Sequence, residues 1–374
     1  MNVFVTTWDE KIEGLGLDGG GVRIWDVLLR DAVDSAVKEA GFRRVEAPIV
    51  GESTLVVPGG TAVLSKGLSL LAQVGRDSGS DVRFHLGGRL GELLDELPGD
   101  RPAFGWLAPG GQGTVEDRLR SAPVVEVSPV ERRIPVPVAG RVLDLVLSDH
   151  LVLPVRHWSH LLWGALLGIG PTVWKRAILD HPLRGGARLA WSALCSWSLD
   201  PLRLAPALND FSRKLVHVHP SAVVEGCVLS DGVRIGAGAV VRGSILGPGA
   251  RVEEQALCEG SVLSDGAVVQ RQAMLRFSVL GPDAMHGGVT QLSVLGSSSE
   301  LKRGAYGMDQ SFTGEVRVQA GSEIVGVPLS MIGICLGPRA RVGSGVWIAP
   351  GRAVPAESVL ISDRVVTRPD REQQ

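Results

Sequence analysis

The residues best suited to chemistry lie between positions 286 and 310 of this 374-residue chain. His286 carries an imidazole that exchanges protons near neutral pH, which makes it a candidate catalytic general base. Lys302 and Arg303 place two adjacent cations where a phosphate group would find partners. A phenol (the only tyrosine of the chain), a carboxylate and an amide follow at Tyr306, Asp309 and Gln310. Together, these side-chain types predict a binding site for a small phosphorylated molecule.

The polar residues interrupt a sequence repeat. Four similar segments follow one another at intervals of 17 residues: Val228–Gly232, Ile245–Gly249, Val262–Gly266 and Val279–Asp283. Within each unit an apolar residue returns about every six positions, and glycine is frequent between them. A short fixed period is typical of one structural unit stacked on copies of itself. We therefore expect triangular coils of short strands, with Leu229, Leu246, Leu263 and Leu280 stacked in the centre.

This pattern resembles the hexapeptide-repeat family of left-handed parallel β-helices. The resemblance covers about residues 215–286 and resumes at Cys335–Gly351. His286 occupies the repeat position that holds an aliphatic residue in earlier units, and the period is irregular from 287 to about 330, where we expect an insertion. In the resembling acyltransferases a histidine is the general base, and acetyl-coenzyme A lies along the coils between the subunits of a trimer. Alternatively, His286 ends a coil with its ring bonded to backbone groups, and the insertion only helps trimer packing.

The first 150 residues alternate between strand and helix patterns. Expected strands include Val3–Thr6, Leu55–Pro58 and Val82–Leu86, and apolar residues at helical spacing predict helices over Ile24–Ala40 and Ser65–Gly75. Such alternation indicates an α/β domain with a largely parallel sheet.

Residues 22–45 and 55–65 resemble the sugar-phosphate nucleotidyltransferases. This implies a Rossmann-like, nucleotidyltransferase-type α/β domain before the β-helix, as in the bifunctional N-acetylglucosamine-1-phosphate uridylyltransferase/acetyltransferases. It also implies a sugar phosphate or nucleotide bound at Gly59, Gly60 and Thr61, with Mg²⁺ accompanying the nucleotide. However, Gly60 stands where that family has its metal-binding aspartate, and the Pro-Lys-Pro stretch is missing. The site is therefore expected to be degenerate, and no metal ligand is assigned.

Residues 151–214 form a tryptophan-rich segment with helical character. It holds five of the nine tryptophans, Trp158, Trp163, Trp174, Trp191 and Trp197. We interpret them as packing at the interface between the two domains, because tryptophan buries a large apolar surface. The alternative is an amphipathic helix that contacts a membrane surface. Its residues would be Arg184, Arg188, Trp191, Leu194, Trp197 and Arg203.

Composition limits the remaining possibilities. The 38 basic and 40 acidic side chains give a net charge of -2, which offers no electrostatic basis for nucleic-acid binding. The four cysteines lack metal-ligand spacing, and neither a signal peptide nor an 18-residue apolar run is visible. We expect a cytoplasmic protein with a domain at 1–150, a connector at 151–214, a β-helix at 215–366 and a frayed tail at 367–374.

Three functions remain open from sequence. The first is a protein of sugar-nucleotide metabolism whose nucleotidyl transfer is degenerate or lost. The second is an acyl- or acetyltransferase that uses His286 and acetyl-coenzyme A. The third is a non-catalytic scaffold or regulator that keeps the fold without the chemistry. A homo-oligomer, most readily a trimer, is expected in each case.

Overall fold

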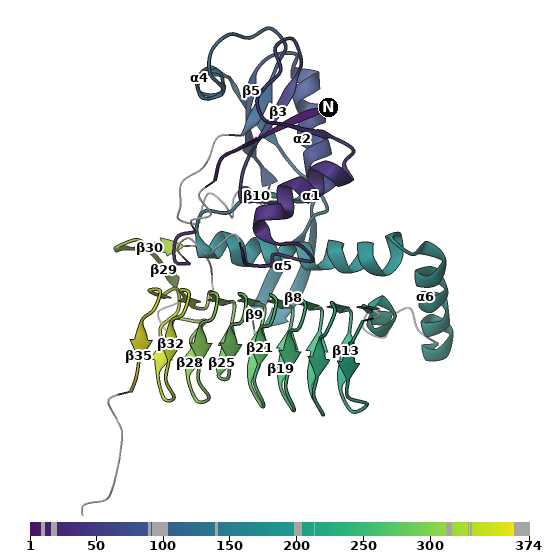
Figure 1. Cartoon of the computed structure of the whole chain (residues 1–374), viewed down its shortest axis with the longest axis vertical. Helices are drawn as coiled ribbons and strands as arrows, with labels where there is room; N and C mark the ends of the chain where they lie inside the picture. The colour runs from purple at the N-terminus through teal and green to yellow at the C-terminus, as the bar shows by residue number, and fades with distance from the viewer. Residues whose placement is uncertain are drawn as a thin grey trace, which may run out of the picture.

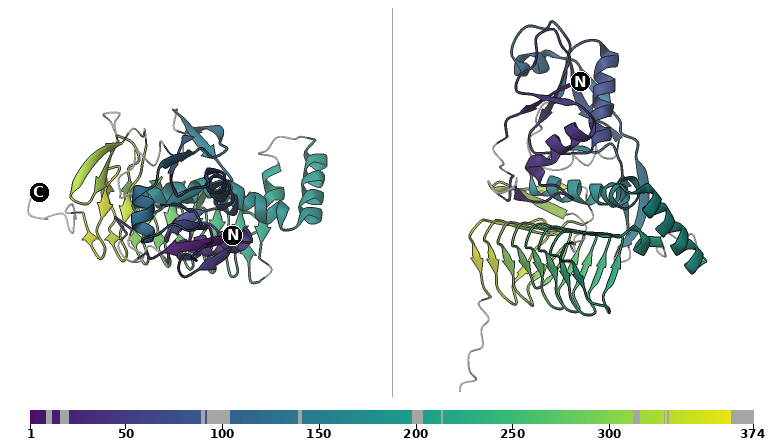
Figure 2. Two further views of the ribbon diagram at one scale, coloured as in Figure 1. Left: turned by 90° about the horizontal axis from the view of Figure 1, so that it is seen from above. Right: turned by 45° about the vertical axis from the view of Figure 1, so that its right-hand side comes forward.

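The computed structural model describes residues 1–8, 12–15, 21–88, 91, 104–138, 141–197, 204–212, 214–311, 316–327, 329 and 331–362, with backbone only for 132–138 and 141–147. An N-terminal α/β domain stands above a long β-helix, and helix α5 (Trp158–Trp174) lies between them (Figure 1). Figure 2 shows that helix α6 (Pro182–Ser196) projects from the body near the first coils.

The N-terminal domain is built on a six-stranded mixed sheet of order β2-β1-β3-β6-β5-β7. Only β6 runs antiparallel to its neighbours. The strands are β1 (Asn2–Thr6), β2 (Arg43–Val45), β3 (Thr54–Pro58), β5 (Val82–Leu86), β6 (Gly105–Leu107) and β7 (Val124–Val127). The helices are α1 (Ala32–Glu39), α2 (Ser65–Ser78) and α4 (Val115–Ser121). The alternation of strand and helix expected from sequence is present.

The first expected helix is shorter than its periodicity indicated. Helical structure begins only with the 3₁₀ turn η2 (Leu29–Asp31) and continues as α1. Ile24 and Trp25 instead pack beneath α5, where the Trp25 indole donates a hydrogen bond to the Gly164 carbonyl at 3.0 Å. Their apolar spacing therefore reflects tertiary packing rather than a helix face.

The segment between the domains contains more than a helical connector. Strand β4 (Thr61–Val63) pairs antiparallel with β10 (Val152–Pro154), which ties the start of this segment to the N-terminal domain. A hairpin of β8 (Arg132–Val138) and β9 (Arg141–Leu147) precedes it. After α5 come the π-helical turn η3 (Lys175–Leu179), α6 and the 3₁₀ turn η4 (Ala205–Leu208). The first coil begins at Asp210, five residues before the expected boundary.

The C-terminal region forms three parallel sheets of stacked repeats, which fit a left-handed β-helix. The first face comprises β11 (Asp210–Phe211), β14 (Val228–Leu229), β17 (Ile245–Leu246), β20 (Val262–Leu263), β23 (Val279–Leu280), β26 (Val294–Leu295), β31 (Cys335–Leu336) and β34 (Ala353–Val354). The second face comprises β12 (His217–Val218), β15 (Arg234–Ile235), β18 (Arg251–Val252), β21 (Val268–Val269), β24 (Met285–His286), β27 (Glu300–Leu301), β32 (Arg341–Val342) and β35 (Val359–Leu360). The third face comprises β13 (Val223–Glu225), β16 (Val240–Arg242), β19 (Leu257–Glu259), β22 (Met274–Arg276), β25 (Val289–Gln291), β28 (Tyr306–Gly307) and β33 (Trp347–Ile348).

The central leucine ladder is where the repeat places it. Leu229, Leu246, Leu263 and Leu280 pair in register along the first face, and all are buried inside the coil. The following corner requires a left-handed backbone, so Gly249 and Gly266 both have φ of 69°. The 17-residue period thus sets both the core and its turns.

The coil continues through the first part of the expected insertion. Strands β25 to β28 extend all three sheets, so the interruption begins after Gly307 and ends before Cys335. It contains a hairpin of β29 (Val316–Ala320) and β30 (Glu323–Val327). The sequence repeat is obscured because the coil that joins Val279 to its partner Val294 is two residues shorter than the 17-residue coils before it. The expected tail, residues 367–374, lies outside the described residues.

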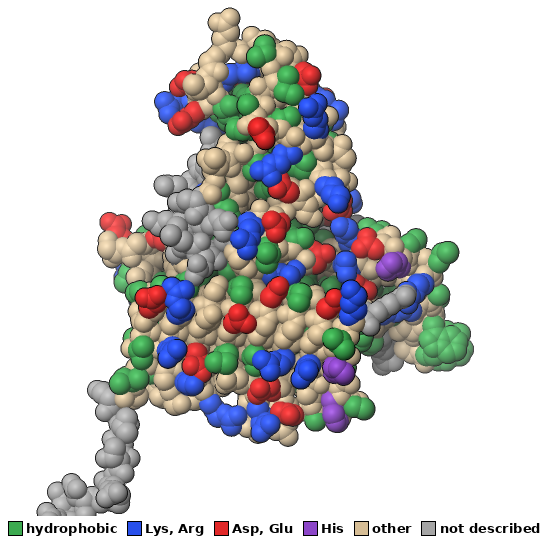
Figure 3. Space-filling view, in the orientation of Figure 1, with side chains coloured by type: hydrophobic (Ala, Val, Ile, Leu, Met, Phe, Trp, Pro, Cys, Tyr) green, Lys and Arg blue, Asp and Glu red, His purple; other side chains and the backbone are tan. Residues whose placement is uncertain are grey.

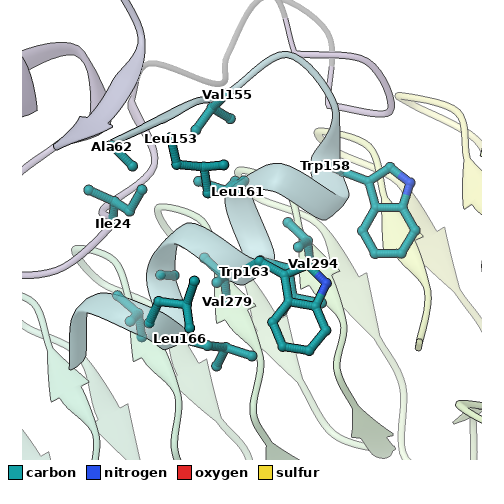
Figure 4. Close-up of a cluster of buried hydrophobic side chains, with 14 of the residues drawn as sticks. Ile24, Ala62, Leu153, Val155, Trp158, Leu161, Trp163, Leu166, Val279 and Val294 are labelled. Atoms are coloured by element: carbon teal, nitrogen blue, oxygen red, sulfur yellow. The ribbon is translucent and has the colours of Figure 1, made fainter. Parts of the chain in front are cut away.

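The first face is buried on both sides. Its inward residues fill the coil, and its outward residues Val228, Ile245, Val262, Val279 and Val294 pack against α5. Figure 4 shows Trp163 and Leu166 of α5 beside Val279 and Val294. Arg23 adds a polar link, because its guanidinium pairs with Asp265 at 2.9 Å. The helix, the N-terminal domain and this face therefore share one hydrophobic core.

Charged side chains of both signs are interspersed over the face drawn in Figure 3. In the described part of the chain, no helix has both the length and the apolar character needed to cross a membrane.

Candidate functional site

His286 lies inside the β-helix. Its ring takes the inward position held by Val269 in the previous coil and by Leu301 in the next, and the side chain is fully buried. Nε2 lies 3.0 Å from the Met274 carbonyl, and Nδ1 has no partner among the described residues. Burial lowers the pKa of His286 to about 4, so the ring is neutral near pH 7. A general base must reach its substrate, and this position does not fit that role. The coil does not end there either.

The predicted binding residues after His286 spread along a corner and into the interruption. Lys302 pairs with Glu300, and Arg303 donates to the Arg271 carbonyl at 3.2 Å, both at the corner between the second and third faces. Tyr306 faces outward on the third face with its ring 5.5 Å from that of Trp347. The remaining two residues, Asp309 and Gln310, lie where the chain leaves the coil; Gln310 contacts Met331, and burial raises the pKa of Asp309.

Gly59, Gly60 and Thr61 lie in the N-terminal domain, in a different part of the molecule. The turn is occupied by Trp8: a Cβ placed on Gly60 would come within 2.4 Å of its indole. Arg156 donates to the Gly59 carbonyl at 3.1 Å and lies over the same indole, 6.0 Å from the ring centre. Thr61 donates its hydroxyl to the Pro58 carbonyl. Side chains therefore fill the space expected to hold a nucleotide.

An open groove of about 820 Å³ lies on the second face at the first coils. His217, Arg234 and Arg251 are register partners on three successive coils, so their side chains form one outward row. His219 and Arg271 also line the groove. Figure 3 shows histidine and basic side chains next to one another at this end of the β-helix. Strand spacing puts the two row arginines about 4.8 Å apart at the backbone.

Charge in the groove is unevenly compensated. Arg271 pairs with Glu254 at 3.0 Å and its backbone N–H donates to Glu253. Within the described ranges, by contrast, no carboxylate forms an ion pair with Arg234 or Arg251. Two uncompensated guanidinium groups on adjacent rungs form a site for phosphate oxygens, since each can donate two parallel hydrogen bonds.

The sequence analysis missed this row, although a signal for it exists. His217, Arg234 and Arg251 each precede an inward residue of the repeat, and they are themselves 17 residues apart. Alternation along a strand turns such residues outward. Because the row follows the regular repeat, no break in the sequence pattern marks it as a site.

Comparison with known proteins supports the repeat assignment. The family model described as GlmU-like, C-terminal hexapeptide matches residues 214–306, less than half of the chain. The C-terminal region is a GlmU-like hexapeptide-repeat domain. This match does not extend to the N-terminal domain, whose likeness to nucleotidyltransferases therefore stays a hypothesis. No curated protein matches the sequence.

Comparison with solved structures finds two acetyltransferases and a hexapeptide transferase family protein, all at low similarity. The acetyltransferase domain of PglB from Neisseria gonorrhoeae is 18% identical over 46% of this chain and 66% of its own, with a TM-score of 0.23. A variant of GDP-perosamine N-acetyl transferase from Caulobacter crescentus, in complex with CoA and GDP-perosamine, is 17% identical over 43% of this chain and 57% of its own, with a TM-score of 0.19. A hexapeptide transferase family protein from Anaplasma phagocytophilum is 14% identical over 38% and 78% of the two chains, with a TM-score of 0.16. This chain thus spans less than two thirds of the first two proteins.

Proposed function

We propose that this protein is a hexapeptide-repeat acyltransferase that binds acyl-coenzyme A in the groove on the second face. The observation that carries the proposal is the pair Arg234 and Arg251, which present uncompensated guanidinium groups on adjacent rungs of an open groove. Coenzyme A carries a pyrophosphate and a ribose phosphate, and both match such a pair. The GlmU-like repeat supports the same class of ligand through the resemblance to acyltransferases.

The groove also offers candidates for the proton transfer. In acyl transfer an amine or hydroxyl attacks the thioester carbonyl, the carbon–sulfur bond breaks, and a base accepts the proton of the nucleophile. His217 and His219 are exposed at the groove, and Nδ1 of His219 lies 2.8 Å from the Ser221 hydroxyl. These imidazoles, rather than the buried His286, are the proposed general bases.

Calorimetry with acetyl-coenzyme A tests the proposal. The Arg234→Ala/Arg251→Ala variant should bind at least about tenfold more weakly, because two charge-assisted phosphate contacts are lost. Dephospho-coenzyme A, which lacks the ribose phosphate, should also bind the unaltered protein more weakly.

The matched control is Arg341→Ala, which removes an outward arginine of the same face several coils away. It should leave the affinity unchanged. If the unaltered protein does not bind acetyl-coenzyme A, or if the double variant binds as well as the control, the groove is not the site.

We also propose self-association through the remaining faces. Because α5 covers the first face, two copies that pack β-helix against β-helix must use the second and third faces. The third face carries an outward row of apolar residues, half-buried or exposed, on every coil: Val223, Val240, Leu257, Met274, Val289, Tyr306 and Trp347. Light scattering should give a trimer that Met274→Asp dissociates; a monomer at all concentrations would refute this.

A non-catalytic scaffold is the second candidate. The Trp8-filled turn and the enclosed His286 both leave predicted active positions without access to substrate. A scaffold predicts no acetyl-coenzyme A binding with the fold and the oligomer intact, so the calorimetry above separates the two functions.

A further inference from the structure

Helix α6 turns its apolar side to solvent. Leu183, Trp191 and Leu194 are 90%, 68% and 59% exposed, and Trp197, which ends the helix, is 90% exposed. The side that faces the body has Gly185 buried against η3, and its half-buried residues are Leu189, Ser192, Ala193 and Ser196. This is the reverse of an ordinary surface helix, whose apolar side faces the core. Figures 1 and 2 show that α6 stands at the outer edge of the molecule.

Basic groups border this apolar side. Arg184 and Arg188 are one turn apart, and α6 contains no acidic residue. Both line a groove of about 820 Å³ between α6 and the first coil, together with Arg176, and Arg188 donates one hydrogen bond to the Asn209 carbonyl at 2.5 Å. Two carboxylates also line it, but one of them, Asp210, already pairs with Arg176 at 3.1 Å. The groove therefore has a surplus of positive charge next to the exposed apolar side chains.

We propose that α6 binds an anionic lipid surface. Trp191, Leu194 and Trp197 enter the boundary between headgroups and acyl chains, where indole rings are favoured, while Arg184 and Arg188 meet lipid phosphates. The helix lies in the plane of the surface and does not cross it. The β-helix would then be held beside the membrane with its groove open to solvent.

The charge distribution favours lipid over a second copy of the chain. A self-complementary interface through α6 would bring the arginines of two copies together, and the helix offers no carboxylate to compensate them. An anionic bilayer supplies both the apolar layer and the negative charge. Arg203, expected from sequence to belong to this surface, lies outside the described residues.

Vesicle co-sedimentation with the full chain tests this inference. We expect binding to vesicles of equimolar phosphatidylcholine and phosphatidylglycerol, much weaker binding to phosphatidylcholine alone, and a loss of binding as sodium chloride is raised. Leu194→Asp should weaken binding at least about tenfold, because it places a charge in the apolar layer. Arg184→Ser/Arg188→Ser should weaken binding to the anionic vesicles specifically.

The matched control is Ile361→Asp, which alters an even more exposed aliphatic residue at the far end of the β-helix. It should bind vesicles like the unaltered protein. Absence of vesicle binding, or equal loss in Leu194→Asp and Ile361→Asp, would overturn the proposal. So would self-association that Leu194→Asp abolishes in the absence of lipid, since α6 would then bind a second copy. Acetyl-coenzyme A affinity, measured on the same variants, is expected to be unchanged, so the test is independent of the proposed function.

Discussion

Helices α5 and α6 are neighbours in the chain and both are rich in tryptophan, yet they have opposite environments. Trp158 and Trp163 of α5 are buried between the N-terminal domain and the β-helix. Trp191 of α6 and Trp197 at its end are exposed. The interface interpretation made from sequence thus describes the first helix, and the membrane alternative becomes a proposal for the second. Tryptophan content alone does not distinguish the two helices. The difference is that α5 packs between two parts of the protein, whereas the apolar side of α6 faces solvent.

The first way to test this contrast is to truncate a buried indole. Trp163→Ala should lower the free energy of unfolding by about 3–5 kcal/mol, because it leaves a cavity between α5 and the outward valines of the first face. Urea denaturation followed by circular dichroism measures the change. A loss below about 1 kcal/mol would mean that α5 is not firmly seated on the coil.

Lowering the pH should decrease the free energy of unfolding, because a buried histidine lies at the start of α5. His157 begins α5, accepts from the Ser159 N–H and has its Nε2 3.0 Å from the Gln319 carbonyl; burial lowers its pKa to about 4. Since the folded-state pKa lies below the ordinary 6.5, the unfolded chain binds the extra proton. Stability is complete above pH 6.5 and falls as the pH drops towards 4, by up to about 3 kcal/mol. His286 has the same shift and acts in the same direction.

Urea midpoints at pH 7.5 and pH 5 measure this loss. The variant His157→Asn/His286→Val keeps an acceptor at the start of α5 and restores an aliphatic residue to the coil, so its midpoint should change less between the two pH values. A loss of equal size in the variant would assign the acid sensitivity to other groups.

The coil could be predicted from sequence because each 17-residue unit contains the residues that form its own core and turns. Leu246 and Gly249 recur as Leu263 and Gly266, and local pattern and tertiary packing agree. His286 shows the limit: its position in the repeat is compatible both with a general base and with a ring bonded to backbone groups, and only the stacked coils show that the ring is enclosed. The filled turn at Gly60 depends on Trp8, about fifty residues earlier, and no local pattern reports such a contact.

Glycines sharpen the comparison between the two helices. A helical glycine replaced by alanine gains up to about 1 kcal/mol from reduced chain entropy where space is free. Gly186 of α6 has open space, so Gly186→Ala should stabilise the protein slightly. At Gly168 of α5 a Cβ would lie 1.9 Å from the Trp25 indole nitrogen, so Gly168→Ala should cost about 1–3 kcal/mol through overpacking. Thermal unfolding of the Gly186→Ala and Gly168→Ala variants measures both effects. If the two variants changed the stability in the same direction, the different packing of the two helices would be contradicted.

The smallest expected effect is the loss of an exposed indole. Trp191→Ala should change the free energy of unfolding by less than about 0.5 kcal/mol, because in the free protein the ring remains in water. The same substitution should weaken vesicle binding. On α6, therefore, stability and vesicle binding respond independently, whereas on α5 the loss of Trp158 or Trp163 acts on stability. A large destabilisation by Trp191→Ala would show that α6 packs against protein in solution, and the membrane proposal would lose its exposed surface.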